Sequence, residues 1–133
     1  MNRYDYHKPT TLEEAWRLRS EIPGGRFIAG GTDVMIQVRR GLVAAPDALI
    51  SLRNVPDLSA VDLGDPIRLG ALVRVRDLID DEGVAAALPA LHAAACALGS
   101  PQVRNVATIG GNLCKGSPAA DLAPPLLLSL IHI

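Results

Sequence analysis

Two pairs of adjacent glycines, Gly30-Gly31 and Gly110-Gly111, have the clearest chemical potential in this sequence. A threonine and an aspartate follow the first pair, and a threonine and an asparagine flank the second. Glycine lets the backbone come close to a ligand. Consecutive N–H groups can then form a concave site for an anion such as a pyrophosphate. Because Gly-Gly is also a common turn dipeptide, ordinary turns are the alternative at both places.

The first pair lies between a predicted strand and a predicted helix. Arg26–Ala29 is a short apolar run between glycines, which favours a buried strand, and Val34–Arg40 before Gly41 indicates a helix. Ala48–Leu52 is a second predicted strand, so residues 26–52 would form one βαβ unit. A turn from strand to helix often holds a phosphate. The spacing matches neither a Rossmann fingerprint nor a P-loop.

The second pair lies within Ala107–Pro125, which is rich in glycine, proline and short polar side chains. Ser117 adds a hydroxyl group and Asp121 a carboxylate. We expect a loop here. From these residues alone, a ligand site and a pair of turns are equally consistent.

Alternating helices and short strands are predicted for the rest of the chain. The expected elements are a helix from the capping box Thr11–Glu14 to Glu21, a hairpin of residues 60–63 and 67–72, a helix Val75–Asp81, and a helix from Pro89 to Leu98 that ends at Gly99.

Three further side chains are expected to have structural roles. Trp16 and Cys96 lie on predicted helices and are interpreted as core residues. His92 is interpreted as structural or exposed, because no second ligand lies at metal-binding spacing. The 2 cysteines are too few for an all-cysteine zinc or iron–sulfur site, so no metal site is expected.

Composition indicates one globular domain with no affinity for nucleic acid or membrane. The 133 residues are 49% apolar and 20% charged, with a net charge of -1 and scattered basic residues. The apolar run Leu126–Ile131 is too short to span a bilayer. The N-terminus lacks a secretory apolar run, and few cysteines are present, so a cytoplasmic location is expected.

Taken together, five motifs resemble the FAD-binding (medium) subunit of the molybdenum hydroxylase family, which includes the xanthine dehydrogenases. They occur in the family's order over nearly the whole chain. The motifs are Ala-Gly-Gly-Thr-Asp (29–33), Leu-Gly-Ala (69–71), Gln-Val-Arg-Asn (102–105), Ala-Thr-Ile-Gly-Gly-Asn (107–112) and Ser-Pro-Ala-Ala-Asp (117–121).

The resemblance implies an α+β, PCMH-type (vanillyl-alcohol-oxidase-like) FAD-binding fold with two lobes. Residues 1–55 would form the first lobe with the Gly-Gly pyrophosphate loop, and residues 56–133 the second lobe with the Thr-Ile-Gly-Gly-Asn loop. Family members are longer, and this chain stops within an apolar stretch that is interpreted as an unfinished buried strand. We therefore expect a C-terminally truncated fragment with an incomplete second lobe, which retains little flavin by itself.

FAD is the implied cofactor, held by residues at the family's motif positions. Asp121 would accept hydrogen bonds from the cofactor's hydroxyl groups. No acid, base, nucleophile or metal ligand is implied. The cofactor-binding candidates are Ile28, Ala29, Gly30, Gly31, Thr32, Asp33, Leu98, Thr108, Gly110, Gly111, Asn112, Ser117 and Asp121.

The implied function is electron transfer in a multi-subunit FAD-dependent oxidoreductase. Electrons would pass from the 2Fe–2S clusters of a small subunit through FAD to NAD or another acceptor, while a large subunit carries the molybdenum cofactor. One alternative is a stand-alone flavin oxidoreductase of the same superfamily. Another is a non-catalytic module that binds a nucleotide or anion.

Overall fold

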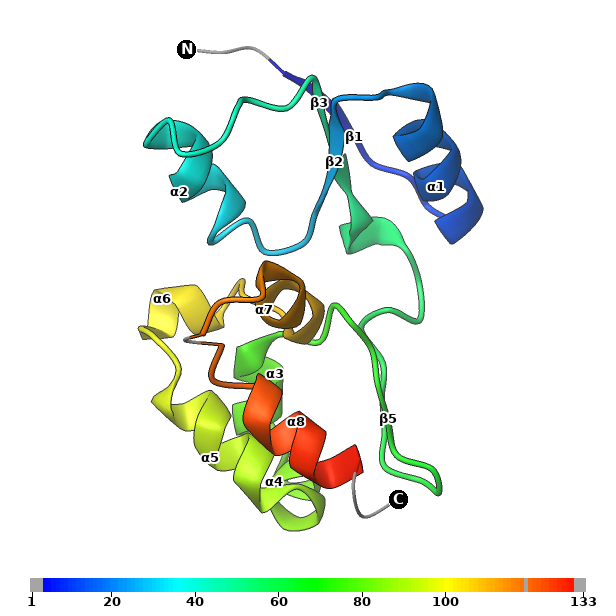
Figure 1. Ribbon diagram of the computed structural model, residues 1–133. Helices are drawn as coiled ribbons and strands as arrows, with labels where there is room; N and C mark the ends of the chain where they lie inside the picture. The colour runs from blue at the N-terminus through cyan, green and yellow to red at the C-terminus, as the bar shows by residue number, and fades with distance from the viewer. Residues whose placement is uncertain (1–3, 119, 131–133) are drawn as a thin grey trace. The chain divides into compact units, whose positions relative to one another are not determined.

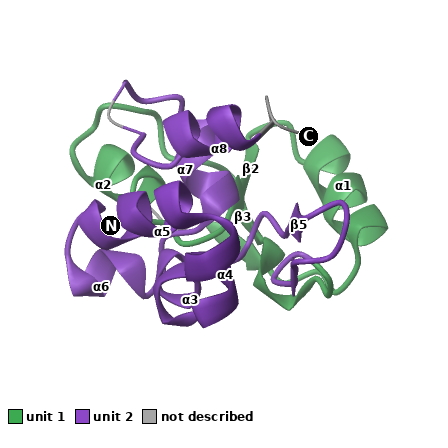
Figure 2. Cartoon of the chain, turned by 90° about the horizontal axis from the view of Figure 1, so that it is seen from below, with its two compact units in different colours: residues 1–57 green, residues 58–133 purple. Residues whose placement is uncertain are grey.

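The computed structural model describes residues 4–118 and 120–130 (Figure 1). The chain divides into two compact units, residues 1–57 and residues 58–133, which Figure 2 colours green and purple.

The first unit is built on a parallel three-stranded sheet. Its strands are β1 (Asp5–His7), β2 (Gly25–Ile28) and β3 (Ala48–Ser51), in the spatial order β1-β3-β2. Helix α1 (Leu12–Glu21) joins β1 to β2, and α2 (Val34–Arg39) joins β2 to β3. The two connections cross the sheet in opposite directions, so right-handed crossovers place their helices on opposite faces, as Figure 1 shows.

Local sequence explains where these elements begin. Thr11 caps α1, since its hydroxyl oxygen accepts the N–H of Glu14 at 3.1 Å, and the Glu14 carboxylate accepts the N–H of Thr10 at 2.9 Å. Gly41 follows α2 with φ of +67°, a conformation that favours glycine. The predicted βαβ unit is confirmed, because β2 and β3 pair in parallel around α2.

Two expectations for this unit are wrong. Strand β2 is an edge strand rather than a buried one, because β3 takes the centre of the sheet, and Phe27 on β2 is 36% exposed. Trp16 is not in the core but is 70% exposed, and its ring stacks on Phe27 with centroids 6.2 Å apart. The buried residue of α1 is its neighbour Ala15. Helix α1 therefore packs on the sheet through a small side chain.

The second unit is mainly helical. Its antiparallel hairpin confirms the predicted one, although the strands are shorter. Its elements are β4 (Val61–Asp62), β5 (Arg68–Leu69), α3 (Val75–Asp80), α4 (Glu82–Ala87), α5 (Pro89–Ala97), α6 (Pro101–Arg104), α7 (Ile109–Lys115) and α8 (Ala123–Leu130). A 3-10 turn, η1 (Leu52–Asn54), belongs to the first unit, where it follows β3.

Apolar side chains from several of these helices form the core of the second unit. His92 lies half-buried on α5, and its Nε2 is 3.2 Å from the carbonyl oxygen of Ile79 on α3, so its expected structural role is confirmed. Cys96 is exposed, contrary to expectation. The buried core residues are Val73, Val75, Leu78, Val84, Leu91, Ala95, Leu98, Ala107, Ile109 and Leu122.

The region expected to be a loop and then a strand contains two helices instead. Ala107–Pro125 includes α7, and the apolar run that follows belongs to α8, while Ile131 lies outside the described residues. Pro124 and Pro125 stand in the first turn of α8, where a missing N–H breaks no helical hydrogen bond. No helix in the described part of the chain is long and apolar enough to cross a membrane.

Candidate functional site

The first glycine segment, Ala29–Asp33, connects the carboxyl end of β2 to the start of α2. Gly31 adopts φ of +77°. A Cβ atom at Gly31 would lie 3.1 Å from Cδ1 of Ile28 and 3.5 Å from Cγ of Met35. The Gly31 carbonyl accepts the N–H of Met35 at 3.2 Å. Within the described residues, no protein acceptor takes up the N–H groups of Gly30, Gly31 or Thr32. These backbone donors can therefore meet an anion.

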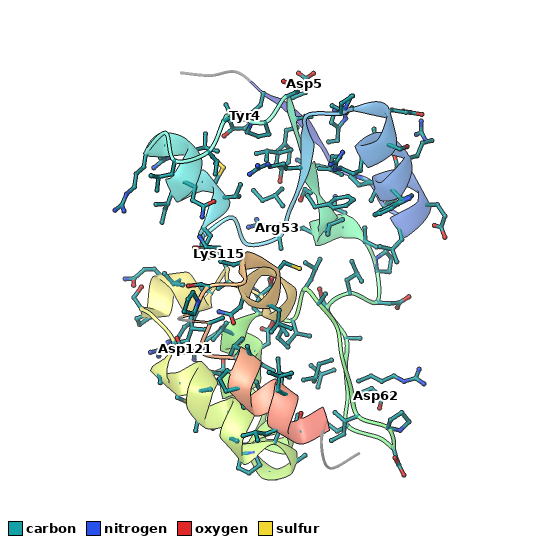
Figure 3. The ribbon with its side chains drawn as sticks, viewed as in Figure 1. Tyr4, Asp5, Arg53, Asp62, Lys115 and Asp121 are labelled. Atoms are coloured by element: carbon teal, nitrogen blue, oxygen red, sulfur yellow. The ribbon has the colours of Figure 1, made fainter. Side chains whose placement is uncertain are left out.

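An arginine that the sequence analysis missed supports this segment. The Nε group of Arg53 donates to the carbonyl oxygen of Ala29 at 3.3 Å, and Figure 3 shows Arg53 beside the connection from β2 to α2. Ligands of parallel sheets bind outside the carboxyl ends of the strands. Arg53 follows β3, the neighbour of β2 in the predicted βαβ unit. That position is the signal by which the sequence could have identified it.

The second glycine segment, Thr108–Asn112, uses its backbone donors within the protein. The N–H of Ile109 donates to Val73 O at 3.0 Å, and that of Asn112 to Thr108 O at 2.9 Å. The N–H of Gly110 donates to Ala71 O at 2.8 Å, and that of Gly111 to the Thr108 hydroxyl oxygen at 3.1 Å. The expected nest of free N–H groups is therefore wrong here. The segment is the capped first turn of α7.

Close packing explains the glycine at position 110. A Cβ atom there would lie 2.8 Å from the carbonyl oxygen and 2.9 Å from the Cβ of Ala71. The motifs 69–71 and 107–112 thus meet, and the contact leaves no room for a side chain at Gly110. Gly70 obeys the same constraint, since a Cβ there would overlap the backbone carbonyl group of Leu58.

Asn112 in the second unit has a buried polar atom that a ligand could satisfy. Its Oδ1 is buried, and no donor among the described residues reaches it. A buried acceptor without a partner costs about 1–3 kcal/mol. Thr108 is 5% exposed, and its hydroxyl already accepts one hydrogen bond and retains its own O–H as a donor.

The other candidates in this unit have different surroundings. Ser117 is half-buried and Asp121 exposed, and both lie on the connection from α7 to α8, where Figure 3 labels Asp121. Leu98 ends α5 and is 6% exposed within the core. Its carbonyl oxygen accepts Nε of Arg104 at 2.7 Å. Packing therefore accounts for the Leu98 side chain.

Arg74 and Asp77 form an exposed ion pair next to the second glycine segment. Arg74 forms an isolated antiparallel bridge with Thr108. Its guanidinium group donates two hydrogen bonds to the carboxylate of Asp77, at 2.9 and 2.7 Å. These bonds lower the pKa of Asp77 and raise that of Arg74. The pair fixes the start of α3 and contacts no other candidate residue in the described set.

The sequence matches the family described as the FAD binding domain in molybdopterin dehydrogenase over residues 2–129. The chain therefore belongs to this family, and FAD is the cofactor of its domain.

Individual relatives agree with this assignment. The chain is 38% identical over 125 residues to the xanthine dehydrogenase FAD-binding subunit of Escherichia coli O157:H7, covering 92% of this chain and 42% of that protein. It is 32% identical over 129 residues to the carbon monoxide dehydrogenase medium chain of Afipia carboxidovorans, covering 96% and 44%. The chain thus spans less than half the length of these relatives.

A solved structure of carbon monoxide dehydrogenase from Hydrogenophaga pseudoflava has the same fold. The TM-score is 0.84 with 33% identity, over 88% of this chain and 41% of that one. The expected FAD-binding fold is confirmed. Like the primary sequence match, the structural match covers only part of its counterpart.

The residues present fit an FAD cofactor. Open N–H groups in the first segment suit pyrophosphate oxygens, and the unpartnered Oδ1 of Asn112 suits a hydroxyl or amine donor. In the described part of the chain, no three His, Cys, Asp or Glu side chains gather as they would around a metal ion.

Proposed function

We propose that this chain is the FAD-binding part of an electron-transfer subunit in a molybdenum hydroxylase. The family match over residues 2–129 is the observation that carries the proposal. The similar proteins from several bacteria are FAD-binding or medium subunits of dehydrogenases, which supports it further.

In this proposal the two glycine segments hold FAD in different ways. Gly30, Gly31 and Thr32 donate backbone hydrogen bonds to the pyrophosphate, and Ile28, Ala29 and Asp33 frame that segment. The second unit contributes mainly through side chains, because the N–H groups of residues 109–112 are already bonded. The proposed residues there are Thr108, Asn112, Ser117 and Asp121. Gly110 and Gly111 let the backbone of this segment pack closely, and Leu98 supports the segment from the core.

Bound FAD would supply the redox chemistry, carrying electrons between iron–sulfur clusters of a small subunit and an acceptor such as NAD. The residues of this chain bind and orient the cofactor. Among the described residues we assign none as an acid or base for a substrate, which the proposed large subunit with its molybdenum cofactor would oxidise. A cytoplasmic location remains a prediction.

Flavin content tests the proposal. The full-length polypeptide that carries this sequence should purify with FAD in near-stoichiometric amount, and it should co-purify with an iron–sulfur subunit and a molybdenum subunit. A yellow protein without those partners would favour a stand-alone flavin oxidoreductase. A colourless protein that binds other nucleotides, but no FAD, would contradict the proposal.

A further inference from the structure

Arg53 lies where the carboxyl end of β3 adjoins the first glycine segment. In the parallel register, Ile28 pairs with Ser51, so the residues beyond both strands emerge at the same edge of the sheet. Nε of Arg53 donates to Ala29 O at 3.3 Å, although the two residues are 24 positions apart. The buried Ser51 hydroxyl accepts the N–H of Arg53 at 3.5 Å. These contacts hold the backbone N–H and the Nε group of Arg53 in place.

Most of the guanidinium group remains available. Arginine has five N–H donors in a planar fork, and the bond to Ala29 uses only the one on Nε. Within the described residues, Nη1 and Nη2 meet no acceptor, and the residue is exposed. The N–H groups of Gly30 and Thr32 on the neighbouring segment are also without protein acceptors. One edge of the sheet therefore combines open backbone donors with a full positive charge.

The charge has a specific use at this edge. A positive charge beside the open N–H groups strengthens the binding of a pyrophosphate, because charge-assisted hydrogen bonds are stronger than those from neutral donors alone.

We propose that Arg53 is a positioning residue for the pyrophosphate of FAD. Its Nε holds the Ala29 carbonyl, and its terminal NH2 groups bind a phosphate oxygen. The inference rests on the proposed FAD-binding function. A lysine could supply the charge but could not hold the carbonyl and bind the phosphate with a rigid fork.

The test is FAD titration of the full-length polypeptide that carries this sequence, followed by the quenching of flavin fluorescence. The variants are Arg53→Gln, Arg53→Lys and, as a control that removes an equal charge from the exposed last turn of α2, Arg39→Gln. Losing a charge-assisted bond should raise the Kd of Arg53→Gln about tenfold or more, with Arg53→Lys intermediate and Arg39→Gln within about twofold.

Phosphorus NMR of FAD at saturation gives a second reading that a purely structural role would not change. The pyrophosphate resonances should shift between wild type and Arg53→Lys but not between wild type and Arg39→Gln. If Arg53→Gln fails to fold, the comparison of Arg53→Lys with Arg39→Gln decides the matter.

The possible failures are distinguishable. A wild-type polypeptide that takes up no FAD contradicts the proposed function, and the role of Arg53 falls with it. A wild type that binds FAD, with Arg53 variants equal to Arg39→Gln in Kd and in phosphorus resonances, overturns the role of Arg53 alone.

Discussion

The backbone N–H groups are open at Gly30-Gly31 and fully bonded at Gly110-Gly111. At the first pair, Gly31 adopts a positive φ, and the N–H groups around it meet no described protein acceptor. At the second pair, the N–H groups hold the first turn of α7 against residues 71–73. Glycine thus has two uses in one chain. The first pair provides donors for a ligand, and the second allows two backbone segments to pack closely.

The largest expected effect is on the packing glycine. Gly110→Ala places a Cβ atom 2.8 Å from Ala71 O and 2.9 Å from Ala71 Cβ. Because backbone atoms cannot easily move aside, we expect the free energy of unfolding to fall by about 3 kcal/mol, the upper part of the range for overpacking. Urea unfolding followed by circular dichroism measures the change.

The double variant Gly110→Ala with Ala71→Gly is the control for that prediction. It removes the Cβ–Cβ contact but leaves the contact with the carbonyl oxygen, so part of the lost stability should return. Wild-type stability for Gly110→Ala would show that Gly110 has no packing role.

A substitution at Gly31 should cause a smaller loss of stability together with weaker FAD binding. Gly31→Ala forces alanine to φ of +77° at a cost of about 1–2 kcal/mol. Gly41→Ala is a matched control, because Gly41 has φ of +67° and nothing lies within 4 Å of its added Cβ. Gly31→Ala should lose at least as much stability in urea unfolding as Gly41→Ala, because its Cβ also lies 3.1 Å from Cδ1 of Ile28, but only Gly31→Ala should bind FAD more weakly. Equal FAD affinity in the two variants would contradict a cofactor role for Gly31.

Replacing Asn112 should weaken FAD binding while changing the stability little. Asn112→Ala removes a buried acceptor that has no described partner. The unfolding free energy should therefore change by less than about 1 kcal/mol, because the lost packing is offset by removal of the unsatisfied group. FAD affinity should fall several-fold in a fluorescence titration. A large loss of stability with unchanged affinity would make Asn112 a structural residue.

The smallest effect is expected at the Arg74–Asp77 pair. Its bonds lower the pKa of Asp77, so this pair contributes stability above the pKa of the unfolded carboxyl group. The contribution is lost as the pH falls through the lower pKa of the folded state. Because both side chains are exposed, Asp77→Asn should cost at most about 1 kcal/mol near neutral pH.

Acid titration checks the sign of that effect. Thermal unfolding of wild type and Asp77→Asn should converge as the pH falls below the usual aspartate range. A difference that grows in acid would contradict the assigned direction.

Local patterns predicted much of the fold. The Thr11 cap, the βαβ unit, the hairpin and the α5 helix that stops before Gly99 follow from capping and turn chemistry within a few residues. Helix α7 was missed because Gly-Gly disfavours a helix, and tertiary contacts from Val73 and Ala71 hold its first turn. Helix α8 was mistaken for a strand, since a short apolar run does not distinguish the two.

The candidate site was also predicted only in part. The resemblance supplied a list of candidate residues, but the state of each N–H group depends on contacts between distant segments. Gly110 donates to Ala71, and Arg53 reaches Ala29, neither of which is visible in a local pattern. The exposure of Trp16 was missed for a related reason, since the neighbouring Ala15 takes the buried position on α1.

Backbone hydrogen–deuterium exchange with and without FAD tests the contrast between the two glycine segments most directly. In the full-length polypeptide that carries this sequence, the N–H groups of residues 30–32 should exchange rapidly without FAD and gain protection when FAD binds. Those of residues 109–112 should already be protected without FAD. FAD-dependent protection that appears at residues 109–112 and not at residues 30–32 would contradict the account.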